Sequence, residues 1–133
     1  MNKICTSIEQ SKKLAEILPL ESADMNWHEL PSIGFFVRTF SYKRDNGATE
    51  GLYPCWSLAA LLGVLPIVYT NIKKEICGPL HIDITDSENP FALWYVNPLH
   101  KGSIVELKTK EYYNLVDSCV EMILKLNENN NLL

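Results

Sequence analysis

The run from Pro54 to Pro66 constrains the fold of this chain more than any other stretch. It is the most apolar part of the sequence and is closed by a proline at each end. Apolar residues occupy almost every side of a helix built on Trp56–Val64, which is typical of a helix buried between layers. Gly63 suits the end of that helix, and Pro66 cannot continue it. We therefore predict a buried central helix around which the rest of the chain packs.

Length and composition limit the range of folds and functions. The chain has 133 residues, of which 47% are hydrophobic and 21% charged, as in an ordinary globular domain with one core. The net charge of -4 argues against broad affinity for nucleic acid or for an anionic membrane. The first residues lack the apolar segment of a signal peptide, and the longest apolar run, Leu58–Val68, contains Gly63 and Pro66. We expect a single cytoplasmic domain over residues 1–133.

The cysteines and histidines follow no recognised metal-binding or redox pattern. The four cysteines lie far apart in the sequence, at Cys5, Cys55, Cys77 and Cys119. Without a CxxC pair or an export signal, we expect reduced thiols. The chain also lacks an HExxH motif, a cysteine cluster and the glycine-rich loops that hold nucleotides. The sequence thus predicts neither a bound metal nor a cofactor.

An amphipathic helix is expected near the N-terminus. Two overlapping pairs, Thr6 with Glu9 and Ser7 with Gln10, fit the capping box, in which two residues satisfy each other's free amides. Apolar residues then recur at helical spacing as far as Pro19. The helix should end before this proline, because the residue preceding a proline is pushed out of the α region.

Two more helical segments are expected. Ser22 fits the cap of a short turn that ends at Met25. Asn114 fits the N-cap of a long amphipathic C-terminal helix whose apolar stripe runs to Leu126. The asparagine-rich residues 127–133 form helix poorly, so we expect the C-terminal end to fray.

Five segments favour strands because they are rich in β-branched and aromatic residues. They are Phe35–Tyr42, Ile67–Ile72, Leu80–Thr85, Phe91–Val96 and Ser103–Lys108. A short polar turn separates the third segment from the fourth, which predicts a hairpin. The expected fold is α+β: a mainly antiparallel sheet of three to five strands with a buried central helix, an N-terminal helix and a C-terminal amphipathic helix.

The segment Leu80–Thr85 alternates between apolar and polar residues. His81 and Asp83 should lie on its outer face, where they could act as a base with its orienting carboxylate or as two metal ligands. A solvent-facing polar edge explains the pair equally well, and two ligands do not make a metal site. The residues expected to face the core are Leu80, Ile82 and Ile84.

Cys55 is the one cysteine in a position that could support chemistry. It precedes the first turn of the expected central helix, where free N–H groups and the helix dipole stabilise a thiolate. A cysteine nucleophile also needs a base, which could be His28, His81 or His100. The alternative is a small buried residue beside Trp56, since free cysteine is among the most buried residue types.

Aromatic residues are more numerous than one small core needs. Trp94 and Tyr95 are neighbours on a strand, so one of them should point away from the core. Together with Tyr53 they are candidates for a binding surface that recognises protein or stacks single-stranded nucleic acid. The acidic net charge favours protein. A second layer that covers both faces of the sheet explains these residues equally well.

Three parts of the chain resemble motifs of known sequences. They are Cys5–Ser11 with Ala23–Met25, Pro54–Leu58 with Leu65–Pro66, and Val116–Ile123. In this order they are similar to segments of small uncharacterised proteins encoded by phages, prophages and mobile elements of gut Bacteroidales. The resemblance implies a cytoplasmic accessory protein of a mobile element. It implies no activity and no site residue.

These observations favour a non-enzymatic protein that binds other proteins. It would act through one face of the sheet or through the loop Lys43–Gly51, which is polar and contains an Asn-Gly turn signal. Its partner would be a host protein, a phage protein or a second copy of the chain. Two alternatives stay open: a small hydrolase or transferase centred on Cys55, and an accessory factor that binds nucleic acid.

Overall fold

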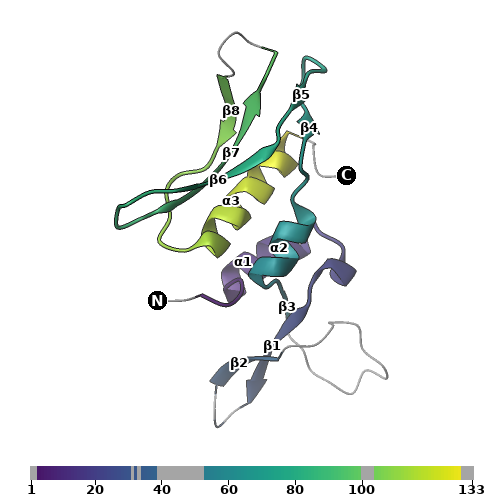
Figure 1. Ribbon diagram of the computed structural model, residues 1–133. Helices are drawn as coiled ribbons and strands as arrows, with labels where there is room; N and C mark the ends of the chain where they lie inside the picture. The colour runs from purple at the N-terminus through teal and green to yellow at the C-terminus, as the bar shows by residue number, and fades with distance from the viewer. Residues whose placement is uncertain (1–2, 31, 33, 39–52, 100–103, 130–133) are drawn as a thin grey trace. The chain divides into compact units, whose positions relative to one another are not determined.

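The computed structural model describes residues 3–30, 32, 34–38, 53–99 and 104–129 (Figure 1). Contacts between residues divide the chain into a unit formed by Lys3–Gly63 and a unit that contains Val64–Leu133. We call them the N-terminal and the C-terminal unit and describe each by itself. Within the described residues, three α-helices and three small antiparallel sheets confirm the predicted α+β class. A single domain over the whole chain stays a prediction, and the loop Lys43–Gly51 lies outside the described residues.

Helix α1 (Ile8–Ala15) opens the N-terminal unit and carries the predicted capping box. The backbone N–H of Gln10 donates to Ser7 Oγ at 3.1 Å, and the Ser7 N–H donates to Gln10 Oε1 at 2.9 Å. Of the two overlapping pairs, Ser7 and Gln10 therefore form the cap. The helix ends at Ala15, before Pro19 as expected.

A three-stranded antiparallel sheet with the order β2-β1-β3 follows in the same unit. Its strands are β1 (Met25–Leu30), β2 (Gly34–Arg38) and β3 (Tyr53–Cys55). The central strand β1 was not predicted. The turn expected from Ser22 to Met25 is wrong, because a short 3-10 helix, η1 (Leu20–Ser22), ends at Ser22 and strand β1 begins at Met25. The predicted strand Phe35–Tyr42 is present as β2, and the residues beyond Arg38 lie outside the described part.

Helix α2 (Leu58–Val64) is shorter and less buried than the predicted central helix. Leu61 is its one buried residue, and Leu62 is 36% exposed. The buried part of this region is instead the chain that enters the helix. Trp56 lies between β3 and α2 and belongs to neither. It is fully buried and donates its indole N–H to Ser22 Oγ at 2.9 Å. The prediction of an all-round buried helix is wrong because the apolar run is divided between a strand end and a helix.

The C-terminal unit contains two sheets and one long helix (Figure 1). Strands β4 (Tyr69–Thr70) and β5 (Ile76–Cys77) form a small hairpin, so the strand predicted over 67–72 is too long. The larger sheet has the order β6-β7-β8 and is antiparallel throughout. Its strands are β6 (Leu80–Ile84), β7 (Phe91–Asn97) and β8 (Ile104–Lys108). The predicted hairpin of β6 and β7 is confirmed.

Helix α3 (Leu115–Glu128) packs against one face of the β6-β7-β8 sheet (Figure 1). Asn114 caps it by accepting the Asp117 N–H at 2.9 Å, as predicted. The helix continues through Glu128, two residues past the point where we expected fraying to begin, and residues 130–133 lie outside the described part. Across the described residues, no helix is long and apolar enough to cross a membrane. The residues that α3 buries are Val116, Ser118, Cys119, Val120, Met122, Ile123 and Leu126.

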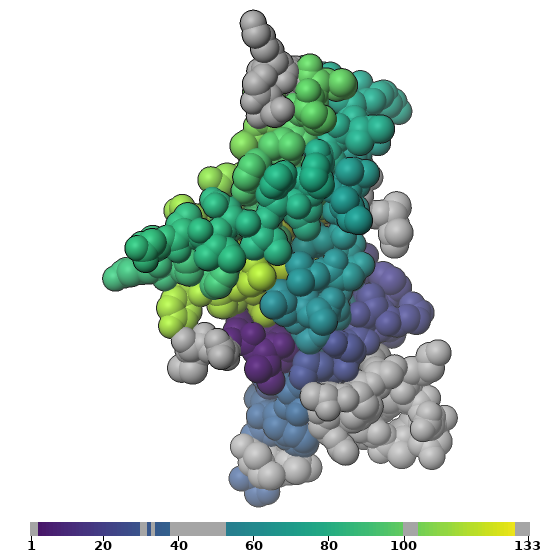
Figure 2. Space-filling model, in the orientation of Figure 1, coloured from purple at the N-terminus to yellow at the C-terminus, as the bar shows by residue number. Residues whose placement is uncertain are grey.

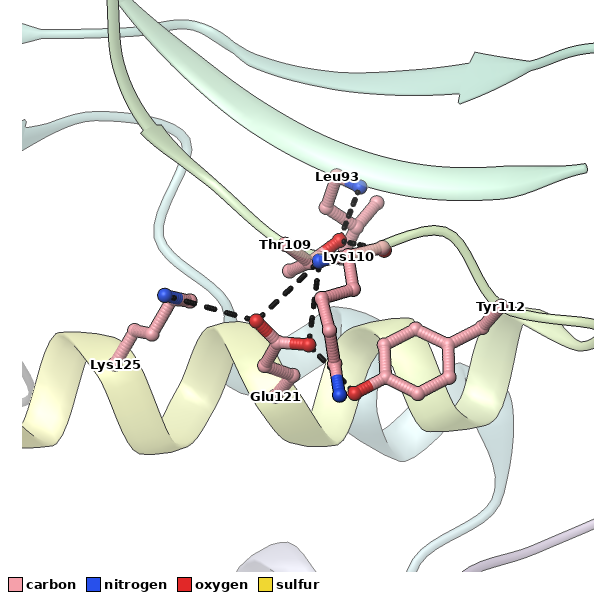
Figure 3. A network of polar contacts seen from close by, with 6 residues as sticks. All are labelled: Leu93, Thr109, Lys110, Tyr112, Glu121 and Lys125. Atoms are coloured by element: carbon pink, nitrogen blue, oxygen red, sulfur yellow. Dashed lines mark hydrogen bonds and ion pairs between the residues drawn. The ribbon is translucent and has the colours of Figure 1, made fainter. Parts of the chain in front are cut away.

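A polar network on α3 ties this helix to the chain that leaves β8 (Figure 3). The Glu121 carboxylate accepts the Tyr112 hydroxyl at 2.5 Å and the Lys110 backbone N–H at 3.3 Å. Lys125, one turn further along, lies 3.6 Å from the same carboxylate. Burial, together with this hydrogen bond, raises the pKa of Tyr112 to about 12. The network therefore fixes where α3 starts relative to the sheet.

The Tyr112–Glu121 hydrogen bond is expected to stabilise the fold measurably. Tyr112→Phe should lower the free energy of unfolding by about 1 kcal/mol, because a partly buried carboxylate loses a hydroxyl donor. The check is chemical denaturation of Tyr112→Phe, Glu121→Gln and the double variant as a thermodynamic cycle. Additive effects of the two changes would contradict a direct bond. Since the Tyr112 pKa is raised in the folded state, this contribution should be present below about pH 10 and disappear as the pH rises towards 12.

Candidate interaction site

Cys55 lies on strand β3, opposite Met25 of β1, and not at the start of a helix. Its side chain is fully buried in a small apolar cluster with Cys5 and Met25, against which Trp27 packs. The Thr6 hydroxyl lies 3.7 Å from Cys55 Sγ, and the thiol donates to the Thr6 carbonyl oxygen at 3.5 Å. Strand pairing and burial, not a helix terminus, therefore define the surroundings of this sulfur.

Hydrogen bonds dominate the electrostatics of the two thiols. The bond from the Cys5 thiol, and after it the Thr6 hydroxyl, lower the pKa of Cys55, although burial opposes them. The same contact with Cys55, together with burial, raises the pKa of Cys5. No hydrogen bond joins Cys55 to an imidazole within the described chain. His28 belongs to the opposite face of β1, where its ring stacks on Phe36 with centroids 5.5 Å apart.

Burial is therefore expected to control the reactivity of Cys55. In the folded protein at neutral pH, iodoacetamide should modify Cys55 at least about tenfold more slowly than in denaturant, because the reagent cannot reach the sulfur. Peptide mapping by mass spectrometry after timed quenching measures this rate. Cys119, which is also fully buried and has a pKa raised by burial, is the internal control. Fast labelling of Cys55 alone would favour the cysteine-enzyme alternative.

Tyr53 is also on β3 and is half-buried. The Lys12 ammonium of α1 lies 5.0 Å from the centre of its ring, within the range of a cation–π contact. Tyr53 belongs to the N-terminal unit, whereas the other two aromatic candidates belong to the C-terminal unit. Its ring therefore has a partner within its own unit.

His81, Asp83 and Trp94 share one face of the β6-β7-β8 sheet. His81 is directly opposite Trp94 in the ladder, and the two rings stack with centroids 4.3 Å apart and planes 12° apart. No hydrogen bond connects His81 with Asp83 among the described residues, so the pair lacks the contact of a base with its orienting carboxylate. The described residues also contain no group of three or more His, Cys, Asp or Glu side chains that could hold a metal.

Tyr95 faces the other side of the sheet and belongs to the core. It is fully buried, its hydroxyl donates to the Pro66 carbonyl oxygen at 2.6 Å, and burial raises its pKa. Trp94, its neighbour, is half-exposed. The alternation expected for this pair is therefore seen, with Trp94 as the residue that points away from the core.

A small cavity of about 150 Å³ lies in the C-terminal unit. This volume matches a molecule the size of benzene. Among the described residues that line it, Glu106 is the one carboxylate, and Asn97 Nδ2 donates to Glu106 Oε1 at 3.2 Å. None of the candidate catalytic residues lines it. The lining residues are Tyr69, Asn71, Ile72, Glu106, Leu107 and Asn129.

Exposed aliphatic side chains are the most distinctive surface feature of the C-terminal unit. Nine such residues are each between 44% and 87% exposed to solvent. Ile82 and Ile84 are among them, at 44% and 68%, although we expected them in the core. They do lie on the face of the buried Leu93, but β6 is the edge strand and α3 packs mainly against the central strand β7. The nine are Ile67, Val68, Ile72, Ile76, Ile82, Ile84, Leu99, Ile104 and Val105.

Sequence reasoning missed this surface because alternation identifies the face of a strand and not its place in the sheet. Comparison with known proteins adds no guide to it: no protein family, no curated protein and no solved structure matches the chain. The candidate site is therefore defined by its own geometry. It consists of the edge strand β6 with its exposed Ile82 and Ile84, and the His81–Trp94 stack on the opposite face of the sheet.

Proposed function

We propose that this chain is a non-enzymatic interaction protein that binds another protein through the apolar surface of its C-terminal unit. The observation that carries the proposal is the exposure of Ile82 and Ile84 on an edge strand, accompanied by seven further exposed aliphatic residues in the same unit. Burying such side chains is the main favourable term in protein association. Large exposed apolar surfaces on a folded protein are typical of binding sites.

The biological setting belongs to the same proposal. The motifs at Cys5–Met25 and Pro54–Pro66 resemble those of proteins encoded by phages and mobile elements, which supports an accessory protein acting in the cytoplasm. Its partner would then be a host or phage protein. The net charge of -4 supports a protein partner over nucleic acid.

A cysteine-dependent reaction has less support. The lowered pKa of Cys55 favours a thiolate, but its sulfur is fully buried and has no imidazole partner in the described part of its unit. A nucleophile must reach its substrate, so burial outweighs the favourable pKa.

The proposed surface can be tested by capture from a lysate of the natural host, with and without phage proteins. The immobilised surface variant carries Ile72→Lys and Ile84→Lys. The matched control carries Leu20→Lys and Leu62→Lys, which alter exposed aliphatic residues of the N-terminal unit by the same charge. We expect a partner, identified by mass spectrometry, that wild type and control retain and the surface variant loses by at least about tenfold. Equal capture by all three proteins would refute the proposal.

A further inference from the structure

Strand β6 has one edge that the rest of the sheet leaves open. In an antiparallel ladder, successive residues turn their backbone N–H and C=O groups alternately towards and away from the neighbouring strand. The Thr85 N–H donates to the Pro90 carbonyl oxygen across the β6–β7 turn. The backbone groups of Asp83 and His81, two and four positions earlier, therefore also point towards β7. The backbone groups of Ile82 and Ile84 therefore point away from the sheet.

Two other hydrogen bonds confirm this alternation. Leu80, which has the same phase as Ile82, donates its N–H to the Ile67 carbonyl oxygen at 2.9 Å and not to β7. On β7, Leu93 is the residue opposite Ile82. Its backbone N–H and C=O both form hydrogen bonds with Thr109, on the β8 side of the strand and not on the β6 side. The open edge thus begins where the Leu80–Ile67 bond ends. Within the described residues, no hydrogen bond reaches the backbone of Ile82 or Ile84 from outside the ladder.

The opposite edge of the sheet is protected, whereas β6 is not. Strand β8 has a register irregularity opposite Tyr95 and Val96, and its sequence includes Glu106 and Lys108. Bulges and charged residues, lysine above all, are common means by which proteins prevent pairing at an edge strand. Strand β6 has a regular register and no lysine or arginine. In Figure 2 the β6–β7 hairpin, coloured teal to green, projects from the rest of the C-terminal unit.

Side chains on the open edge determine which kind of strand would fit. Ile82 and Ile84 offer two exposed aliphatic side chains on one face. Asp83 lies between them on the other face, and its carboxylate forms no ion pair with a described residue. A residue directly opposite Asp83 in an added strand would stand close to that carboxylate, where a basic side chain is favourable and an acidic one is not.

We infer that the partner adds an extended strand to β6 at Ile82–Ile84, with aliphatic residues on one face and a lysine or arginine opposite Asp83. This inference rests on the proposed function and names the mode of binding and the chemistry of the partner. The added strand hydrogen-bonds to the outward N–H and C=O groups of Ile82 and Ile84, as in other cases of recognition by strand addition.

A second copy of the chain fits this edge less well. In a two-fold pair of β6 strands, the register that spares the Leu80–Ile67 bond and joins the outward residues of β6 to one another pairs Ile82 of one copy with Ile84 of the other. That register places Asp83 directly opposite the Asp83 of the other copy. Like charges directly opposite one another destabilise a strand pair. The charge pattern therefore favours a basic segment of a different protein.

The test uses two blocked heptapeptides, one of alternating valine and lysine and one of alternating valine and glutamate. Hydrogen exchange followed by NMR reads the amides of β6 at millimolar peptide. With the lysine peptide, the outward N–H groups of Ile82 and Ile84 should exchange at least about tenfold more slowly. The Asp83 N–H, already bonded within the ladder, should change little. The glutamate peptide should protect neither edge amide.

Two variants make the test specific. Ile84→Pro removes an outward N–H without removing a ladder bond, and a proline is tolerated at such an edge position. It should abolish the effect of the lysine peptide, whereas the matched control Ile84→Val should keep it. Asp83→Lys should reverse the preference, so that the glutamate peptide now protects the edge amides.

The outcomes separate this inference from the broader proposal. If neither peptide protects Ile82 and Ile84 but capture of a partner still depends on Ile72 and Ile84, strand addition is wrong and an interaction surface stands. If capture is also unaffected, both fail. If the edge amides become protected without peptide as protein concentration rises, a second copy occupies the edge and the inferred partner is wrong.

Discussion

The C-terminal unit depends on one packing constraint: a single helix covers a sheet of three strands. Helix α3 lies against the face that contains Leu93 and Tyr95, both fully buried on the central strand. One helix is about 10 Å wide, whereas three strands at a spacing of about 4.8 Å occupy about 14 Å. The edge strands are therefore covered only in part. Exposure of Ile82 and Ile84 follows from this geometry, although their apolar character equals that of buried strand residues.

Much of the fold could be predicted because local signals coincide with the structure that forms. The capping residues Ser7 and Asn114 interact with their own next turn, and the β6–β7 hairpin joins neighbours in sequence. Elements that depend on distant partners were harder to predict. Strand β1 contains Asn26, His28 and Glu29, and it forms because β2 and β3 pair with it on both sides. Its alternation of Met25 and Trp27 with polar residues was the available signal.

The candidate site shows the same division. That one of Trp94 and Tyr95 faces away from the core is a property of any strand, so the sequence was sufficient to expect it. Which residues of β6 stay exposed depends on strand order, and that order is a long-range property that no local pattern contains. Cys55 illustrates the converse. Its place before an apolar helix suggested a reactive thiol, but pairing with Met25 puts it on a strand and buries it with Cys5.

An unprotected apolar edge is costly to a protein that has no use for it, because it invites aggregation as readily as binding. The same sheet shows that protection was available: β8 combines an irregular register with charged residues that include a lysine, and β6 has neither a bulge nor a lysine or arginine. Between the two exposed isoleucines, Ile82 and Ile84, the strand carries the acidic Asp83. A single acidic residue permits pairing with a basic strand while opposing pairing between two copies. The edge therefore combines an attractive element for one class of partner with a repulsive element against self-association.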